Sequence, residues 1–103
     1  MPKSMMVRYR TTPEAAEENQ RLVEAVYREL NADDPGGFRY ATFRLADGVT
    51  FVHLVAYDSE DDNPLQRSAA FKEFQQDFAS RAVESPEFTD VTLVGEYSPS
   101  VAG

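Results

Sequence analysis

Polar and hydrophobic side chains alternate in several segments of this chain, which is the period of a β-strand. Residues 5–10 alternate in this way. Residues 38–45 and 49–57 are rich in β-branched and aromatic residues, and the short loop between them contains Asp47-Gly48, a combination that predicts a β-hairpin. Residues 88–97 alternate again. The pattern therefore predicts four strands.

The segment after the first strand repeats its apolar residues every three or four positions, as an amphipathic helix does. Thr12 is a candidate N-cap with Pro13 in the first helical position, and Thr11 with Glu14 forms an alternative capping box. The Asp-Asp-Pro-Gly-Gly sequence at residues 33–37 predicts the end of this helix.

A second helix is predicted between the hairpin and the last strand. Asn63-Pro64 offers one start and Ser68 offers another, and Ser85-Pro86 follows an end near Val83. The apolar stripe expected to be buried consists of Leu65, Phe71, Phe74, Phe78 and Ala82.

The elements follow the order strand, helix, strand, strand, helix, strand. This order predicts an α+β, ferredoxin-like βαββαβ fold, with a four-stranded antiparallel sheet and both helices on one face. The length of 103 residues fits one domain, 1–103, with a core over about residues 5–97.

The third predicted strand is apolar on both of its faces. Its second face carries Val52, Leu54 and Ala56, although the helices cover only one side of such a sheet. Monomeric proteins rarely expose an apolar patch of that extent. We therefore expect a homodimer in which two sheets pack face to face, most simply about a two-fold axis.

Composition removes several classes of function. The chain has no Cys and one His, which excludes disulfide scaffolds, thiolate metal sites and His-rich centres. A net charge of -8 without a basic segment disfavours nucleic-acid binding. No apolar run approaches the roughly 20 residues that cross a membrane, and the N-terminus does not resemble a signal peptide, so a cytoplasmic location without membrane contact is expected.

The acidic run Asp58–Asp62 is the one candidate for binding a cation. It lacks the alternating Asp pattern and the distal Glu of an EF-hand loop. It is therefore interpreted as a solvated loop, and no metal site is predicted.

His53 is the only imidazole, so any imidazole-based proton transfer depends on it. It shares a strand face with Phe51, Val55 and Tyr57. One interpretation is a general base that faces an apolar pocket. The other is a half-buried strand residue that forms hydrogen bonds across the dimer or with a neighbouring side chain.

Aromatic side chains on the strands and on the second helix are the candidates for binding a substrate. Tyrosines on the strands would orient a polar aromatic ligand, and phenylalanines spaced three and four apart on the helix would form an apolar wall. The same side chains equally suit a packed core. The candidate substrate-binding residues are Tyr9, Phe51, Tyr57, Phe74 and Phe78.

The order of elements, the length, the doubly apolar third strand and the segment Phe71-Lys72-Glu73-Phe74 resemble the antibiotic-biosynthesis-monooxygenase group of the dimeric α/β-barrel superfamily. The resemblance covers about residues 5–97. It implies a group that contains cofactor-free monooxygenases of polycyclic phenols and haem-degrading enzymes. The haem-degrading branch carries a His ligand on the second helix, where this chain has none, so no cofactor is expected.

Two functions remain from the sequence. The first is a cofactor-independent monooxygenase that oxygenates or binds a small aromatic, polyketide-like molecule between sheet and helices. The alternative is a non-catalytic module that binds a small apolar ligand or serves only as a structural dimer. An enclosed pocket with the His53 ring or a tyrosine hydroxyl pointing inward would favour the enzyme or the ligand-binding protein over the structural module.

Overall fold

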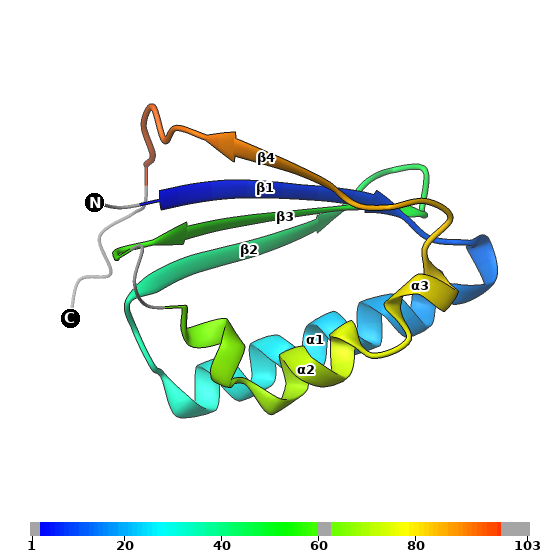
Figure 1. The fold of residues 1–103 in the computed structure, drawn as a ribbon, viewed down its shortest axis with the longest axis horizontal. Coiled ribbons are helices and arrows are strands. Elements are labelled where there is room, and N and C mark those ends of the chain that lie inside the picture. Colours follow the sequence, from blue (N-terminus) through cyan, green and yellow to red (C-terminus); the bar gives the residue numbers. More distant parts are fainter. Residues whose placement is uncertain (1–2, 60–62, 98–103) are drawn as a thin grey trace.

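The computed structural model describes residues 3–59 and 63–97. It contains one antiparallel sheet with the strand order β2-β3-β1-β4, and the helices pack on one of its faces (Figure 1). The predicted ferredoxin-like fold is confirmed. The strands are β1 (Lys3–Arg10), β2 (Phe38–Arg44), β3 (Thr50–Tyr57) and β4 (Glu87–Val91). The helices are η1 (Pro13–Ala15), α1 (Ala16–Asp33), η2 (Pro64–Arg67), α2 (Ala69–Gln75) and α3 (Phe78–Arg81).

The first helical segment begins as one of the two predicted alternatives. The Thr12 hydroxyl accepts a hydrogen bond from the Ala15 backbone N–H at 3.2 Å, and Pro13 occupies the first helical position. The helix ends where Asp34 adopts a left-handed conformation with φ 47°. The buried face of α1 consists of Ala16, Asn19, Val23 and Val26.

The predicted hairpin is present and joins β2 to β3. One carboxylate oxygen of Asp47 accepts hydrogen bonds from the backbone N–H groups of Val49 and Thr50, both at 2.9 Å. Gly48 supplies the positive φ of 79° that the turn requires. These contacts fix the register that places alternate β3 side chains toward the helices.

The second helical segment differs from the continuous helix that the sequence predicts. Both predicted starts are used, because Asn63 caps η2 and Ser68 caps α2 through their side-chain oxygens. A further break follows α2, where Asp77 has a left-handed φ of 58° before α3 begins. At this break, the guanidinium group of Arg81 donates hydrogen bonds to the backbone carbonyl oxygens of Phe74 and Gln76.

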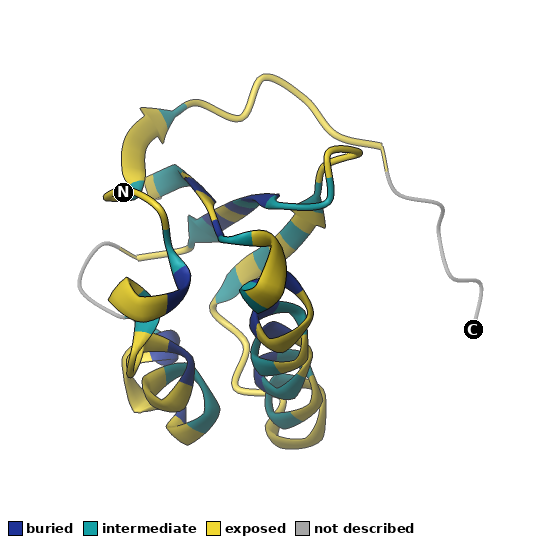
Figure 2. Cartoon of the chain, turned by 90° about the vertical axis from the view of Figure 1, so that its right-hand side faces the viewer, coloured by how far each residue is buried: buried dark blue, intermediate teal, exposed yellow. Residues whose placement is uncertain are grey.

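The last strand is shorter than predicted and ends at Val91 rather than at residue 97. Val91 pairs with Ser4, so the ladder between β4 and β1 ends one residue from the beginning of β1. Residues 92–97 arch over the face of the sheet opposite the helices (Figure 2). An ion pair between Arg39 and Glu96 holds this segment across the sheet.

The core lies between the inner face of the sheet and the helices. Its buried cluster consists of Tyr9, Val23, Val26, Phe51, Val55, Leu65 and Phe74. The outer face differs, because Phe43 and Leu54 remain 53% and 38% exposed there. The described part of the chain contains no helix long and apolar enough to cross a membrane. Most of the acidic run falls on residues 60–62, which lie outside the described residues.

Candidate functional site

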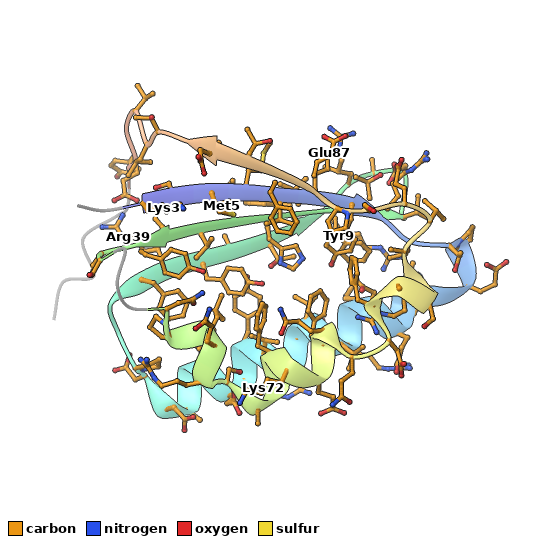
Figure 3. The ribbon with its side chains drawn as sticks, viewed as in Figure 1. Lys3, Met5, Tyr9, Arg39, Lys72 and Glu87 are labelled. Carbon is orange, nitrogen blue, oxygen red and sulfur yellow. The ribbon has the colours of Figure 1, made fainter. Side chains whose placement is uncertain are left out.

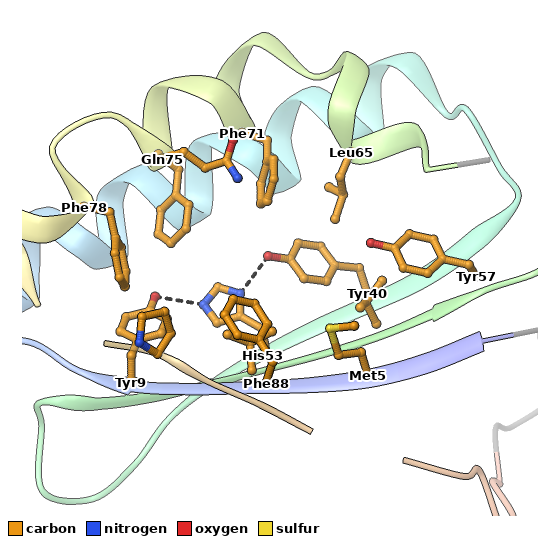
Figure 4. Close-up of a pocket in the computed structure, with 14 residues that line it drawn as sticks. Met5, Tyr9, Tyr40, His53, Tyr57, Leu65, Phe71, Gln75, Phe78 and Phe88 are labelled. Atoms are coloured by element: carbon orange, nitrogen blue, oxygen red, sulfur yellow. Dashed lines mark hydrogen bonds between the residues drawn. The ribbon is translucent and has the colours of Figure 1, made fainter. Parts of the chain in front are cut away.

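A cavity of about 310 Å³ lies between the inner face of the sheet and α2. Side chains from β1, β2 and β3 form its floor and those from η2, α2 and α3 form its roof, while Pro86 and Phe88 border it near β4 (Figures 3 and 4). No lining residue in the described chain carries a carboxylate. The lining residues are Met5, Val7, Tyr9, Tyr40, His53, Val55, Tyr57, Leu65, Phe71, Phe74, Gln75, Phe78, Pro86 and Phe88.

His53 lines this cavity and therefore faces the helices rather than the outer face of the sheet. Its side chain is only 5% exposed. A hydrogen bond of 2.8 Å joins Nε2 to the Tyr9 hydroxyl, and one of 2.7 Å joins Nδ1 to the Tyr40 hydroxyl (Figure 4). The Thr42 hydroxyl lies 3.2 Å from Nδ1. Both ring nitrogens therefore have partners within the chain.

Burial determines the charge of this imidazole. Removal from water disfavours the protonated ring and lowers the pKa of His53 to about 4. The ring is thus neutral at pH 7, with one nitrogen protonated and the other a hydrogen-bond acceptor.

A chain of buried polar groups continues from Tyr9 into the protein. Asn19 donates from Nδ2 to the Tyr9 hydroxyl oxygen at 2.9 Å, and Arg81 donates from Nε to Asn19 Oδ1 at 3.1 Å. Arg81 also donates to the carbonyl oxygens of Phe74 and Gln76, at 2.5 and 3.1 Å. Its guanidinium carbon lies 5.3 Å from the centroid of the Phe74 ring, within the range of a cation–π contact.

Neither Asn19 nor Arg81 was singled out from the sequence. The signal for Asn19 is visible in retrospect, because it interrupts the apolar stripe of α1 between Ala16 and Val23. Asn19 is completely buried, and a buried amide at such a position needs hydrogen-bond partners. No local signal marks Arg81, since its role depends on the break after α2.

A second group of hydroxyls surrounds the other side of the imidazole. The hydroxyls of Tyr27 and Thr42 lie 2.7 Å apart, and the ring of Tyr27 stacks on that of Tyr40 with centroids 5.1 Å apart. Burial raises the pKa of both Tyr27 and Tyr40 above the usual value for tyrosine, so their hydroxyls stay protonated at neutral pH. Tyr40 is the member of this group that lines the cavity.

The predicted substrate-binding residues divide into two sets. Tyr9, Tyr57, Phe74 and Phe78 line the cavity together with His53. Phe51 does not line it. Its side chain is 1% exposed and stacks against Tyr9 with ring centroids 5.6 Å apart, so the structure makes it a core residue beneath the site.

Among the described residues, no cluster of three or more His, Cys, Asp or Glu side chains is positioned to hold an ion. The polar groups of the cavity are instead the imidazole, the Gln75 amide and tyrosine hydroxyls. This set suits hydrogen bonding to an organic ligand in an apolar environment.

A family model described as antibiotic biosynthesis monooxygenase matches residues 3–77. This chain belongs to the antibiotic biosynthesis monooxygenase family. The match extends from β1 through α2 and includes both tyrosines that bind His53. No curated protein matches the chain significantly.

Solved structures share the fold at low sequence identity. The Rv0793 protein of Mycobacterium tuberculosis is 22% identical, with a TM-score of 0.73 over 95% of this chain and 100% of its own. A proposed antibiotic biosynthesis monooxygenase of Nitrosomonas europaea is 16% identical, with a TM-score of 0.74 over 90% of each chain. PA3566 of Pseudomonas aeruginosa is 14% identical, with a TM-score of 0.74 over 91% of this chain and 95% of its own. These similarities support the family fold and leave the ligand to be argued from the site.

Proposed function

We propose that this protein binds a small, flat aromatic molecule in the cavity between sheet and helices and oxygenates it without a cofactor. The observation that carries the proposal is the cavity itself, an apolar chamber of about 310 Å³ with aromatic walls and a few convergent polar groups. Its volume falls at the small end of ligand pockets, which span about 300–1,000 Å³. Membership of the monooxygenase family supports oxygenation as the reaction.

The proposed chemistry draws its electrons from the substrate. In a cyclic aromatic ketone such as anthrone, loss of a proton from the ring CH₂ leaves an electron pair that reduces O₂. A carbon–oxygen bond forms and gives a hydroperoxide after protonation. Loss of water then turns the carbon into a second carbonyl, so one oxygen atom enters the product and the other leaves in water.

The protein contributes binding, orientation and exclusion of water to this reaction. Phe71, Phe74 and Phe78 provide an apolar roof, and burial of a flat ring system against them is favourable. Apolar walls strengthen each hydrogen bond made to the bound anion, and a ligand that fills the cavity displaces water from it. His53 acts on the substrate through a tyrosine hydroxyl that it orients, and Tyr57 contributes a further hydroxyl at the cavity wall.

We infer that the working protein is a homodimer joined through the outer face of the sheet. This face exposes Phe43 and Leu54, and the segment containing Leu93 and Val94 arches above it with those side chains 57% and 97% exposed. The space of about 590 Å³ beneath that segment is lined mostly by apolar groups of β2, β3 and residues 91–95. A second sheet would cover this surface. Sedimentation at micromolar concentration is expected to give a two-chain species, and a clean monomer would contradict the inference.

Oxygen consumption with anthrone as the probe tests the proposed reaction. We expect uptake of one O₂ for each anthraquinone formed, at a rate above that of anthrone in buffer. Val7→Trp places a large ring in the cavity beside His53 and is expected to abolish the added rate. Ala69→Trp, at an exposed position of α2, is the matched control and should retain it.

Binding of aromatic probes without any oxygen uptake across a panel of aromatic ketones and phenols would support the alternative of a non-catalytic ligand-binding module. Absence of both binding and turnover would contradict the proposed function. Equal rates in Val7→Trp and the parent protein would place the reaction outside this cavity.

A further inference from the structure

In the buried chain of hydrogen bonds, Arg81 determines which group donates and which accepts at each following step. Arg81 carries only donor groups, because a guanidinium has no acceptor. Its Nε bonds to the side chain of Asn19, so the atom that faces it must be the amide oxygen, as found at 3.1 Å. The amide NH₂ of Asn19 therefore faces Tyr9 and donates to its hydroxyl oxygen.

The bond from Asn19 in turn determines how the Tyr9 hydroxyl binds His53. Its oxygen already accepts from Asn19, and its own hydrogen needs an acceptor because the side chain is buried. Among the described residues, the remaining contact of this hydroxyl is His53 Nε2 at 2.8 Å. With Nε2 protonated instead, the Tyr9 hydrogen would be buried without a partner, at a cost of about 1–3 kcal/mol. The structure thus favours the imidazole tautomer with Nε2 as acceptor.

The other imidazole nitrogen must then be a donor, since the ring is neutral. Nδ1–H donates to the Tyr40 hydroxyl oxygen at 2.7 Å, with the Thr42 oxygen as a longer alternative at 3.2 Å. His53 consequently does not accept the hydrogen of Tyr40. The hydroxyl hydrogen of Tyr40 is therefore available to Thr42 or to a ligand. Of Tyr27, Tyr40 and Thr42, Tyr40 is the residue that lines the cavity.

We propose that Tyr40 donates a hydrogen bond to the bound molecule, and that the cavity therefore selects aromatic ligands presenting an acceptor oxygen, as in a ketone, an enolate or a phenolate. Asn19 and Arg81 are positioning residues that set this direction through Tyr9 and His53. The inference rests on the proposed function, because it assumes an aromatic ligand in the same cavity.

The proposed donor also suits the proposed reaction. When an aromatic ketone loses a proton from its ring CH₂, negative charge develops on the ketone oxygen, and a fixed donor in an apolar site stabilises that charge more than it stabilises the neutral ketone. Tyr40 has the required protonated hydroxyl. A free acceptor at the same position would instead oppose the anion.

A pair of probes that differ in one oxygen tests the role of Tyr40. Fluorenone and fluorene have the same flat three-ring frame, but only fluorenone carries a carbonyl. The parent protein is expected to bind fluorenone more tightly than Tyr40→Phe does by about fivefold, the effect of one hydrogen bond, while fluorene binds both proteins equally. The infrared carbonyl stretch of bound fluorenone should lie at lower frequency in the parent than in Tyr40→Phe.

Asn19→Asp tests whether the chain sets the direction. The new carboxylate would accept from both Arg81 and the Tyr9 hydroxyl, so Tyr9 would accept from His53 Nε2–H and Nδ1 would accept from Tyr40. Tyr40 would then offer an acceptor to the ligand. The expected result is a shift of preference from fluorenone toward the alcohol 9-fluorenol by about fivefold. Asn31→Asp, an identical change at an exposed position of α1, is the control and should leave the preference unchanged.

The outcomes separate this inference from the proposed function. If neither fluorene nor fluorenone binds the parent protein, the aromatic cavity site fails. If both bind, but Tyr40→Phe leaves fluorenone affinity and the carbonyl stretch unchanged, the cavity site stands and the donor role of Tyr40 is overturned. If the stretch moves while Asn19→Asp folds and keeps the parent preference, the control by Asn19 is overturned.

Discussion

The two faces of β3 differ in the burial and the hydrogen bonding of their side chains. Phe51, His53 and Val55 face the helices and are buried, and both polar atoms of the imidazole have hydrogen-bond partners. On the opposite face, Leu54 remains 38% exposed although it is centrally placed in the sheet. On one side, β3 therefore contributes to a buried site whose polar groups are hydrogen-bonded. On the other side, it contributes to an apolar surface that is still exposed to solvent.

This difference indicates where each kind of function lies. The buried polar groups of the inner face form a hydrogen-bond chain with a defined direction. An apolar core of similar size would be stable without such groups. The outer face presents the surface that a second copy of the sheet would cover. We therefore expect changes to the outer face to alter assembly and changes to the inner face to alter stability and ligand preference.

The largest effect is expected from Leu54→Asp on the outer face. In a face-to-face dimer each copy would bury an unpaired carboxylate, which costs about 3–5 kcal/mol, so the affinity between subunits should fall by more than about 1,000-fold. Sedimentation of the variant should give a single chain with an unchanged circular dichroism spectrum. Val83→Asp, at an exposed apolar position between α3 and β4, is the control. A two-chain species in Leu54→Asp would place the interface elsewhere.

A smaller effect is expected from Arg81→Met on the inner side. Loss of the guanidinium leaves the Asn19 amide oxygen and the carbonyls of Phe74 and Gln76 without their donor, so the free energy of unfolding should fall by about 2–4 kcal/mol. Urea unfolding measures this change. Arg21→Met removes a surface ion pair with Glu18 and should change the same quantity by at most about 0.5 kcal/mol. Equal effects of the two variants would contradict the structural role of Arg81.

The smallest of these effects concerns pH. Because the pKa of His53 falls from 6.5 in the unfolded chain to about 4 in the folded protein, the unfolded state binds more protons between these values. Stability from this group is complete above pH 6.5 and is lost as the pH falls toward 4, by about 2 kcal/mol between pH 7 and pH 5. Urea unfolding of the parent and of His53→Phe at both pH values isolates the contribution of His53 to the pH dependence of the free energy of unfolding. An identical pH dependence in the two proteins would contradict the buried, neutral imidazole.

The sequence predicted the fold because the relevant information is local. Period-two alternation, the Asp47-Gly48 turn and the Thr12 cap each act within a few residues. The turn and the cap appear in the structure where expected, and so do the first three strands. Two predicted elements differ from the structure. The last strand ends at Val91, which pairs with Ser4 near the beginning of β1, and the second helix breaks before Arg81, whose guanidinium group binds the Phe74 carbonyl.

The site was predictable in part for the same reason. Strand parity placed Tyr9, His53 and Tyr57 on the face that lines the cavity. It also placed Phe51 on this face, but parity does not distinguish the cavity wall from the packed core beneath it. The partners of His53 come from β1 and β2. Asn19 and Arg81 are 62 residues apart in the chain, so their contact follows only from the assembled fold.

The direction of the hydrogen-bond chain is the central claim, and the presence of a single His makes it directly measurable. Two-dimensional ¹H–¹⁵N NMR of the uniformly labelled protein at pH 7 reports both ring nitrogens of His53 without ambiguity. We expect a neutral ring with the proton on Nδ1 and an unprotonated Nε2, and the reverse assignment in Asn19→Asp. A parent spectrum with the proton on Nε2, or a doubly protonated ring, would contradict it.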